Sequence, residues 1–401
     1  MAFASIDLPE PRIGTRVHAA EQGDSDGVAI ARGAAGLGGL EADWREISGR
    51  AGDTAAFLGF GYALAAARFH EARGEKVVVA VAHWLGRPAA AVAVVLLRRA
   101  GVTIGTALGD PVTQYSDALL AADAPRRLVG LALRAIAEAE GVHLFDFRRV
   151  RAESPLTPAL AAMTRADAVR AEAPYADLTR AADVSTLLLE VAGAKHRRER
   201  ARSRRRLAER GDLAFEVFRG EAAVGPLAEA FRVKGDWLAR NGHFSRVIED
   251  PAALALLQEA GRDPVEGASL VVARLSVGGA PAAYEVGLVR GRRFHAYLGA
   301  VVHDFAGASP GKVVMEDALG WAKAEGLETY DLLAPADRYK REWSTGAVAV
   351  RDFVAPMSWK GRLYAGPWHG TLRPALRRSL DGLPPVVRRV AARAAAALGI
   401  R

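Results

Sequence analysis

The chain has 401 residues, a formal net charge of +8 and no cysteine. Half of its residues are apolar, as in ordinary globular proteins, and its length suits two domains of ordinary size. The lack of cysteine excludes disulfide bonds, thiolate metal sites and a cysteine nucleophile. Charged residues come before any apolar run at the N-terminus, so we expect no secretory signal and a cytoplasmic enzyme.

The N-terminal residues 1–40 predict a flexible lead with a strand or two, and residues 44–73 predict two helices. The apolar stretch 77–97 is long enough for a membrane span. However, His83 and the turn Gly86-Arg87-Pro88 divide it into two halves of strand length. We therefore expect a buried hairpin at this place.

One order of elements (strand, turn, strand, strand, helix, strand) occurs twice in the chain. The predicted elements are strands at 77–82, 89–97, 102–108 and 144–147 with a helix at 125–139, and then strands at 270–275, 282–289, 294–298 and 329–332 with a helix at 310–325. In each copy a glycine, Gly141 or Gly326, stands five residues before an aspartate, Asp146 or Asp331. Glycine is favoured at the left-handed position that ends a helix, so this match has a structural cause.

The repeat predicts an α/β (α+β) fold of two tandem domains, each with a mixed central sheet flanked by helices. The expected divisions are a lead at 1–40, a first, remodelled copy at 41–190, a basic connecting helix at 191–212, a second, catalytic copy at 213–357 and a basic amphipathic tail at 358–401.

Basic residues gather in the connecting helix and in the tail. The tail has nine Lys and Arg residues against Asp381 alone. Its mixture of arginines and aliphatic residues predicts a helix that lies on an anionic membrane, while the connecting helix could hold a phosphorylated ligand. Solvated helix faces explain both clusters equally well. No aromatic side chains interleave with either basic run, so we expect no nucleic-acid partner.

No motif supports the common nucleotide, metal or hydrolase sites. Gly59-Phe60-Gly61 lacks the preceding strand and the third glycine of a dinucleotide fingerprint, and Gly307 to Lys312 is one residue too short for a phosphate loop. The histidines show no metal-ligand spacing, so we expect no metal, and no Gly-x-Ser-x-Gly elbow is present.

The start of the second predicted helix is a candidate anion site. Ser309 suits the N-cap and Pro310 the first turn, with Gly311 and Lys312 following. The free N–H groups of such a terminus can bind a pyrophosphate, and we expect these residues to hold one. Simple helix capping is the alternative interpretation.

Several motifs carry a resemblance to a known family. They are Tyr297 to Asp304, Ser309-Pro310-Gly311, the helix ending at Gly326, Tyr330-Asp331 and Tyr339-Lys340-Arg341-Glu342-Trp343. With them, residues 282–343 resemble the GNAT-type acyltransferases of the CelD-like kind (cellulose and exopolysaccharide biosynthesis) and, more distantly, the FemABX peptidyltransferases. A looser likeness covers about residues 40–360, including Lys195 to Gly211 and Gln114-Tyr115-Ser116-Asp117.

The resemblance implies two tandem GNAT-like domains that transfer an acyl group from acetyl-CoA or a longer acyl-CoA to an amine. The FemABX branch uses aminoacyl-tRNA, which stays open as a donor. In that branch a Phe-Lys pair assists the transition state, and Tyr339-Lys340 stands at this place here. The CoA loop of single-domain GNAT enzymes is missing, with Ser309-Pro310-Gly311 as a minimal substitute. We expect substrate contacts from Gln114, Tyr115, Asp117, Lys195 and Arg198.

Amine acylation needs a proton acceptor and a donor for the developing oxyanion. Glu285 is a carboxylate inside the apolar strand 282–289, and His295 and Tyr297 share a face of the next strand. We expect Glu285 and Tyr297 to relay a proton, although a structural ion pair between Glu285 and Arg293 is an alternative. Lys340 would neutralise phosphate or oxyanion charge, and Asp331 would hold a loop.

The sequence therefore predicts a cytoplasmic N-acyltransferase, peripheral on the inner membrane if the tail binds lipid. Its expected acceptor is an amino sugar of a polysaccharide or lipid-linked glycan precursor. A long-chain amine such as a sphingoid base, and a non-catalytic GNAT-like module in polysaccharide assembly, are the alternatives.

Overall fold

The computed structural model describes residues 27–52, 56–164, 167–262, 269–367, 390–391 and 393–394. Most of the N-terminal lead lies outside these ranges. Of the tail expected to bind a membrane, α11 (Trp359–Pro367) is described, and nearly all of the remainder lies outside. None of the described helices is both long and apolar enough to cross a bilayer.

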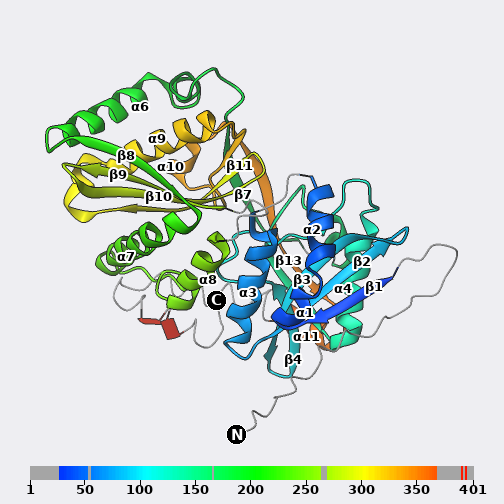
Figure 1. Ribbon diagram of the computed structural model, residues 1–401. Helices are drawn as coiled ribbons and strands as arrows, with labels where there is room; N and C mark the ends of the chain where they lie inside the picture. Colours follow the sequence, from blue (N-terminus) through cyan, green and yellow to red (C-terminus); the bar gives the residue numbers. More distant parts are fainter. Residues whose placement is uncertain are drawn as a thin grey trace, which may run out of the picture.

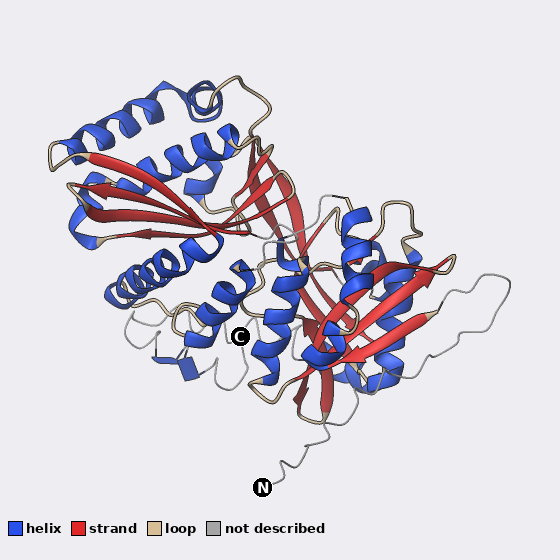
Figure 2. Cartoon of the chain, in the orientation of Figure 1, coloured by secondary structure: helices blue, strands red, loops and turns tan. Residues whose placement is uncertain are grey.

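A single mixed sheet runs through both parts of the chain (Figures 1 and 2). Its order is β1-β2-β3-β4-β6-β13-β7-β12-β11-β10-β9-β8, with β5 paired to β3. The strands are β1 (Val28–Arg32), β2 (Lys76–Trp84), β3 (Arg87–Arg99), β4 (Val102–Ala107), β5 (Leu119–Leu120), β6 (Leu144–Arg151), β7 (Asp167–Asp177), β8 (Leu213–Arg219), β9 (Ser269–Val277), β10 (Ala280–Arg290), β11 (Arg293–Val301), β12 (Thr329–Asp331) and β13 (Gly346–Pro356).

The helices cover both faces of this sheet (Figure 2). They are α1 (Gly33–Gly38), α2 (Glu41–Arg50), α3 (Phe60–Glu71), α4 (Arg127–Glu140), α5 (Leu156–Met163), α6 (Val184–Ala208), α7 (Val224–Arg240), α8 (Pro251–Gly261), α9 (Pro310–Ala324), the single turn α10 (Arg338–Arg341) and α11. The mixed α/β architecture predicted from the sequence is confirmed. The apolar stretch at 77–97 forms the buried antiparallel hairpin β2–β3, as predicted.

The repeat is visible in the strand pairing. In the first half, β4 runs parallel to β6 and pairs at three positions that end at Thr106 and Asp146. In the second half, β11 runs parallel to β12 and also pairs at three positions, which end at His295 and Asp331. The helix before each aspartate strand ends at a glycine of positive φ: 59° at Gly141 and 76° at Gly326. The same local sequence pattern has therefore produced the same local structure twice.

The two halves exchange strands at the centre of the sheet. β13, which comes from the expected second copy, pairs with β6 of the first half. β7, which precedes the connecting helix, pairs with β12 of the second half. β13 and β7 then pair with each other over most of their length. Each half is thus completed by a strand from the other side of the chain, and the segments 41–190 and 213–357 are interlocked (Figure 1).

A buried polar network lies beside this exchange. Asp331, at the end of β12, is fully buried and forms an ion pair with Arg151 at the end of β6. The Tyr115 hydroxyl of the first half donates to the same carboxylate at 3.0 Å. A shared apolar cluster adds to this contact, since it joins side chains of α1–α3 to side chains of α7 and α8.

We predict that Asp331→Ala lowers the free energy of unfolding by roughly 3 kcal/mol, because buried Arg151 would keep its charge with only the half-exposed Glu153 as a partner. Equilibrium unfolding in urea measures this loss. Asp123→Ala is a matched control, since Asp123 pairs with Arg50 at an exposed position and should lose much less stability. Equal losses in the two variants would show that the network does not hold the halves together.

Candidate active site

The site is built on the separation of two parallel strands. β11 and β12 pair from Arg293–Thr329 to His295–Asp331 and no further. β11 continues to Val301, whereas the chain turns away after Asp331. The later part of β11 therefore presents backbone groups on the side from which β12 has departed, and polar side chains from three other elements reach this place.

Glu285 lies on β10 directly opposite Gly299 of β11 and is 7% exposed. The Tyr330 hydroxyl donates to Oε1 of Glu285 at 3.1 Å. Gly299 leaves room for the carboxylate, since a Cβ there would lie 3.4 Å from Oε2. Burial raises the pKa of the Glu285 carboxyl to about 7, although the Tyr330 hydrogen bond and the charges of Lys234 and Lys340 act in the opposite direction. Glu285 thus has the pKa of a proton acceptor at neutral pH.

Two half-buried lysines lie on the two sides of the strand separation. Lys234 of α7 donates to the Gly299 carbonyl at 3.2 Å, and Lys340 of α10 donates to the Leu333 carbonyl at 2.9 Å. Burial lowers the pKa of both ammonium groups, while the charge of Glu285 favours their protonation. A carboxyl group with raised pKa is therefore flanked by two cations with lowered pKa.

Lys234 was not among the predicted site residues. The sequence does contain a signal, because Lys234 lies three residues after Phe231 and four before Leu238, on the buried stripe of an amphipathic helix. A lysine on such a stripe places its charge against the protein interior.

Asp331 holds the loop that follows β12, as the sequence suggested. Its Oδ1 accepts the Leu333 backbone N–H at 2.9 Å, and Leu333 has a positive φ of 59°. This strained conformation is uncommon for a branched apolar residue and is found mostly at functional sites. It turns the Leu333 carbonyl toward Lys340, so Asp331 contributes to the position of the lysine.

The expected contact between Glu285 and Tyr297 does not form. The pairing of β10 with β11 shifts between Val286 and Gly287, where a bulge changes the alternation of side chains. Tyr297 packs against the apolar cluster on the α7 face, and its hydroxyl donates to the Val112 carbonyl at 3.0 Å. Glu285 instead bonds Tyr330, so the relay partner predicted on β11 is replaced by a tyrosine on β12. Arg293 lies 3.5 Å from Asp331, not beside Glu285.

Tyr339 lies next to Lys340 on α10 and is 54% exposed. Its position at the surface of the site leaves it accessible to a ligand, whereas Lys340 points inward to the Leu333 carbonyl. The Tyr339-Lys340 pair thus lies beside the strand separation.

The start of α9 follows a short 3₁₀ helix, η3 (His303–Ala308), and adjoins the end of β11. Ser309 does not cap the helix with its side chain, contrary to expectation, because its own backbone is left-handed with φ 57°. Gly311 is close-packed, since a Cβ there would lie 3.1 Å from a Val301 methyl group. Lys312 forms an ion pair with Glu199 of α6 at 2.9 Å.

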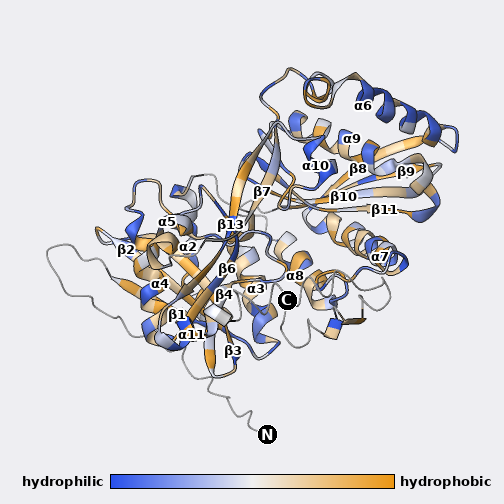
Figure 3. Ribbon diagram, turned by 180° about the vertical axis from the view of Figure 1, so that it is seen from behind, coloured by the Kyte–Doolittle hydropathy of each residue, from blue (hydrophilic) through white to orange (hydrophobic). Residues whose placement is uncertain are grey.

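The basic helix α6 begins at Val184 and bends at Gly193, where φ is 74°. Its inner face binds acidic residues of α9: Arg200 pairs with Glu316 at 2.8 Å, and Arg204 pairs with Asp317. Lys195 and Arg198 are exposed on its outer face, which is hydrophilic in Figure 3. Part of the basic cluster therefore joins α6 to α9, and part is exposed on the outer face of α6.

The predicted substrate residues of the first half have mostly structural partners. Gln114 accepts a hydrogen bond from Arg149 at 2.6 Å, and the Ser154 hydroxyl donates to Asp117 at 2.6 Å. Tyr115 is 1% exposed and belongs to the Asp331 network. The structure does not bring these three side chains to Glu285. Among the described residues, no cluster of His, Asp and Glu could hold a metal ion.

Residues 194–341 match the protein family described as Acetyltransferase (GNAT) domain. No curated protein sequence matches the chain. Among solved structures, FemX is 11% identical with a TM-score of 0.54, and the similarity covers 81% of this chain and 97% of FemX. The C-terminal domain (DUF2156) of a putative lysylphosphatidylglycerol synthetase from Agrobacterium fabrum is 17% identical with a TM-score of 0.49, covering 80% and 94%. A tandem GNAT protein from the clavulanic acid biosynthesis pathway is 13% identical with a TM-score of 0.45, covering 82% and 99%.

The matched segment contains Glu285, Tyr330, both lysines and the start of α9. Residues 194–341 are therefore similar to a GNAT acetyltransferase domain, and this similarity supports an acyltransferase. The fold of 81% of the chain is similar to that of FemX.

The raised pKa of Glu285 predicts a stability that depends on pH. Between pH 4.5 and 7 the folded protein holds a proton that the unfolded chain lacks, so stability falls as pH rises through this window and then stays level. The shift corresponds to about 3 kcal/mol. Glu285→Gln cannot titrate, so its free energy of unfolding relative to the parent should increase by about this amount from pH 4.5 to pH 8.

Urea unfolding of both proteins at several pH values measures this difference. Glu229→Gln is a matched control, because Glu229 also accepts a tyrosine hydroxyl, from Tyr284 at 2.7 Å, but lies at a more exposed position. A difference between Glu285→Gln and the parent that does not change with pH would contradict the buried-carboxyl interpretation.

Proposed function

We propose that the protein is an N-acyltransferase that moves an acyl group from an acyl-CoA to an amine, at the strand separation of the second half. The observation that carries this proposal is the buried Glu285 carboxyl between Lys234 and Lys340, beside the unpaired edge of β11. An amine acceptor must lose a proton before it attacks, and a carboxyl group of pKa about 7 can take that proton at neutral pH.

The reaction proceeds by attack of the neutral amine on the thioester carbonyl. The new N–C bond forms while the carbonyl oxygen becomes an oxyanion, and the C–S bond then breaks to release the CoA thiolate. Glu285 accepts the first proton of the ammonium group, and the thiolate takes the second. Lys340 stabilises the oxyanion, since a cation in a poorly hydrated place acts strongly on developing charge. The Tyr330 hydroxyl fixes the orientation of Glu285.

The donor phosphates are assigned to the start of α9, with Ser309, Gly311 and Lys312. Lys195 and Arg198 of α6 lie close by, because Glu199 on the same helix turn binds Lys312. Backbone N–H groups and nearby cations are suitable ligands for a pyrophosphate. Acetyl-CoA and longer acyl-CoA both fit this assignment, which leaves the acyl chain length open.

The first half is assigned a supporting role. After β4, residues 108–118 fold back over the place that corresponds to the strand separation, and Ser116 bonds the backbone of Arg148 in both directions, at 3.3 and 3.2 Å. In the first half, this segment occupies the place that is equivalent to the open space beside β11 in the second half. The chemistry is therefore proposed for one half only.

We further propose that the acceptor is an amino sugar of a polysaccharide or of a lipid-linked glycan precursor, in line with the CelD-like resemblance. FemX shares the fold alone at 11% identity and does not define the acceptor. A peripheral contact of residues 358–401 with anionic lipid would suit a lipid-linked acceptor.

We expect kcat/KM for acyl transfer to rise with pH through about pH 7, as Glu285 loses its proton. Glu285→Gln and Lys340→Ala should each lower turnover at least tenfold without unfolding the protein. Steady-state kinetics with acetyl-CoA and an amino-sugar acceptor measure both effects. Glu229→Gln should retain the parent turnover and pH profile. Unchanged turnover in both Glu285→Gln and Lys340→Ala would contradict this mechanism.

Donor binding gives a second test. Gly311→Ala adds a methyl group where the helix start meets Val301, and we expect at least a tenfold loss of CoA affinity by calorimetric titration. The melting temperature should fall only slightly, because the higher helix propensity of alanine offsets part of the close contact with Val301. Gly320→Ala, in the same helix with open space around it, should bind CoA like the parent. A parent protein without CoA affinity would favour aminoacyl-tRNA as donor or a non-catalytic module.

A further inference from the structure

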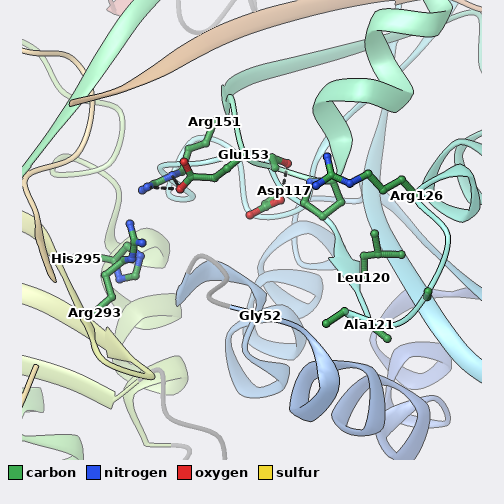
Figure 4. Close-up of a pocket in the computed structure, with 13 residues that line it drawn as sticks. Gly52, Asp117, Leu120, Ala121, Arg126, Arg151, Glu153, Arg293 and His295 are labelled. Atoms are coloured by element: carbon green, nitrogen blue, oxygen red, sulfur yellow. Dashed lines mark hydrogen bonds and ion pairs between the residues drawn. The ribbon is translucent and has the colours of Figure 1, made fainter. Parts of the chain in front are cut away.

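A cavity of about 330 Å³ is lined by residues of both halves, and Glu285 is not among them (Figure 4). One wall comes from the segment between β5 and α4 and from the turn after β6. The opposite wall comes from the start of β11, with Arg293 and His295. In Figure 4 these two side chains lie across from Leu120, Ala121 and Arg126. A cavity of this size is at the lower end for small-molecule sites.

His295 in this wall is fully buried and incompletely bonded. Its Nδ1 lies 3.3 Å from the Leu288 carbonyl, which can only accept, so Nδ1 carries the proton. Burial lowers the pKa of the ring to about 4, so His295 is neutral at pH 7. Nε2 then offers a lone pair, and it has no hydrogen-bond partner among the described residues. Buried polar atoms are nearly always paired, so this atom requires a donor from elsewhere.

Three arginines and two carboxylates, Asp117 and Glu153, line the cavity, and both carboxylates have partners within the lining, Ser154 for Asp117 and Arg151 for Glu153. Arg151 is bound by Glu153 at 2.6 Å and by Asp331, and Arg293 lies 3.5 Å from Asp331. Arg126, in contrast, is exposed at the start of α4 and forms no ion pair with any residue in the described ranges. Its guanidinium can bind a phosphate or carboxylate through two N–H groups at once.

We propose that this cavity is a second small-molecule site, which binds a hydroxyl-bearing anion of the kind found in sugar phosphates and sugar acids. The anionic group binds Arg126, and a hydroxyl group donates to Nε2 of His295. The cavity shares none of the residues assigned to the acyl donor or to the proton acceptor. The site therefore does not depend on the proposed acyl transfer.

Calorimetric titration of the full chain with glucose 6-phosphate and with gluconate tests this proposal, and the two ligands separate a phosphate from a carboxylate preference. Glucose and inorganic phosphate each supply only half of the recognised groups and should bind at least tenfold more weakly. Arg126→Gln and His295→Phe should each lower the affinity for the preferred anion at least tenfold, as expected for a hydrogen bond to a charged or buried group. Arg134→Gln, on the exposed side of the same helix, should leave it unchanged.

The His295→Phe variant has a second readout. It removes an unpaired buried atom and keeps a ring of similar size, so its melting temperature should equal or exceed that of the parent. The exposed Arg126 can be replaced without disturbing the core, so Arg126→Gln decides the question if His295→Phe fails to fold. The absence of saturable binding of both anions to the parent, or an unchanged affinity in Arg126→Gln, overturns the proposal. A parallel loss of CoA affinity in Arg126→Gln would show that the cavity belongs to the donor site instead.

Discussion

The early end of the pairing between β11 and β12 is the constraint on which the active site depends. Two parallel strands that stay paired would satisfy each other's backbone groups and leave no room for a ligand. Here the pairing stops at His295 and Asp331, and the carbonyls of Gly299 and Leu333 bind lysines instead of a neighbouring strand. The polar backbone groups freed by the separation thus determine where the two cations lie.

The strand exchange gives this opening a rigid frame. β12 has only three residues, yet β7 pairs with its other edge and β13 pairs with β7. Asp331 is fixed by Arg151 and Tyr115 from the first half, and it fixes Leu333 in turn. The first half therefore contributes to the candidate active site by holding the buried carboxylate of Asp331 in place. A GNAT domain cut from this chain would lose β7 or the partners of Asp331, so the two halves form one structural unit.

The sequence predicted the parts of the fold that depend on local pattern. The helix C-termini at Gly141 and Gly326 follow from the backbone preference of glycine. The buried hairpin β2–β3 follows from the spacing of apolar residues. The exchange of β7 and β13 was not predicted, because alternation within a strand does not define its partner far along the chain. Of the candidate site, the sequence singled out Glu285, as one carboxylate in an apolar strand, and Lys340, from a motif, but it did not predict the strand separation beside them.

The residues that contact Glu285 could not be predicted from the sequence in the same way. The bulge beside Gly287 transfers Tyr297 to the opposite face from Glu285, and a single inserted residue leaves almost no trace in an apolar pattern. Tyr330 became the partner of Glu285 only because β12 lies beside β11. Local sequence identifies a residue of unusual chemistry more readily than the residue that contacts it.

Burial has opposite effects on the groups of the site, and this difference suits the proposed reaction. It raises the pKa of Glu285 and lowers the pKa values of Lys234 and Lys340, so the three groups exchange protons at smaller cost than they would in water. When an acceptor ammonium gives its proton to Glu285, the carboxylate charge disappears from between the two lysines. Their positive charges are then less compensated at the moment when the oxyanion forms, so removal of the proton strengthens the field that stabilises the next step.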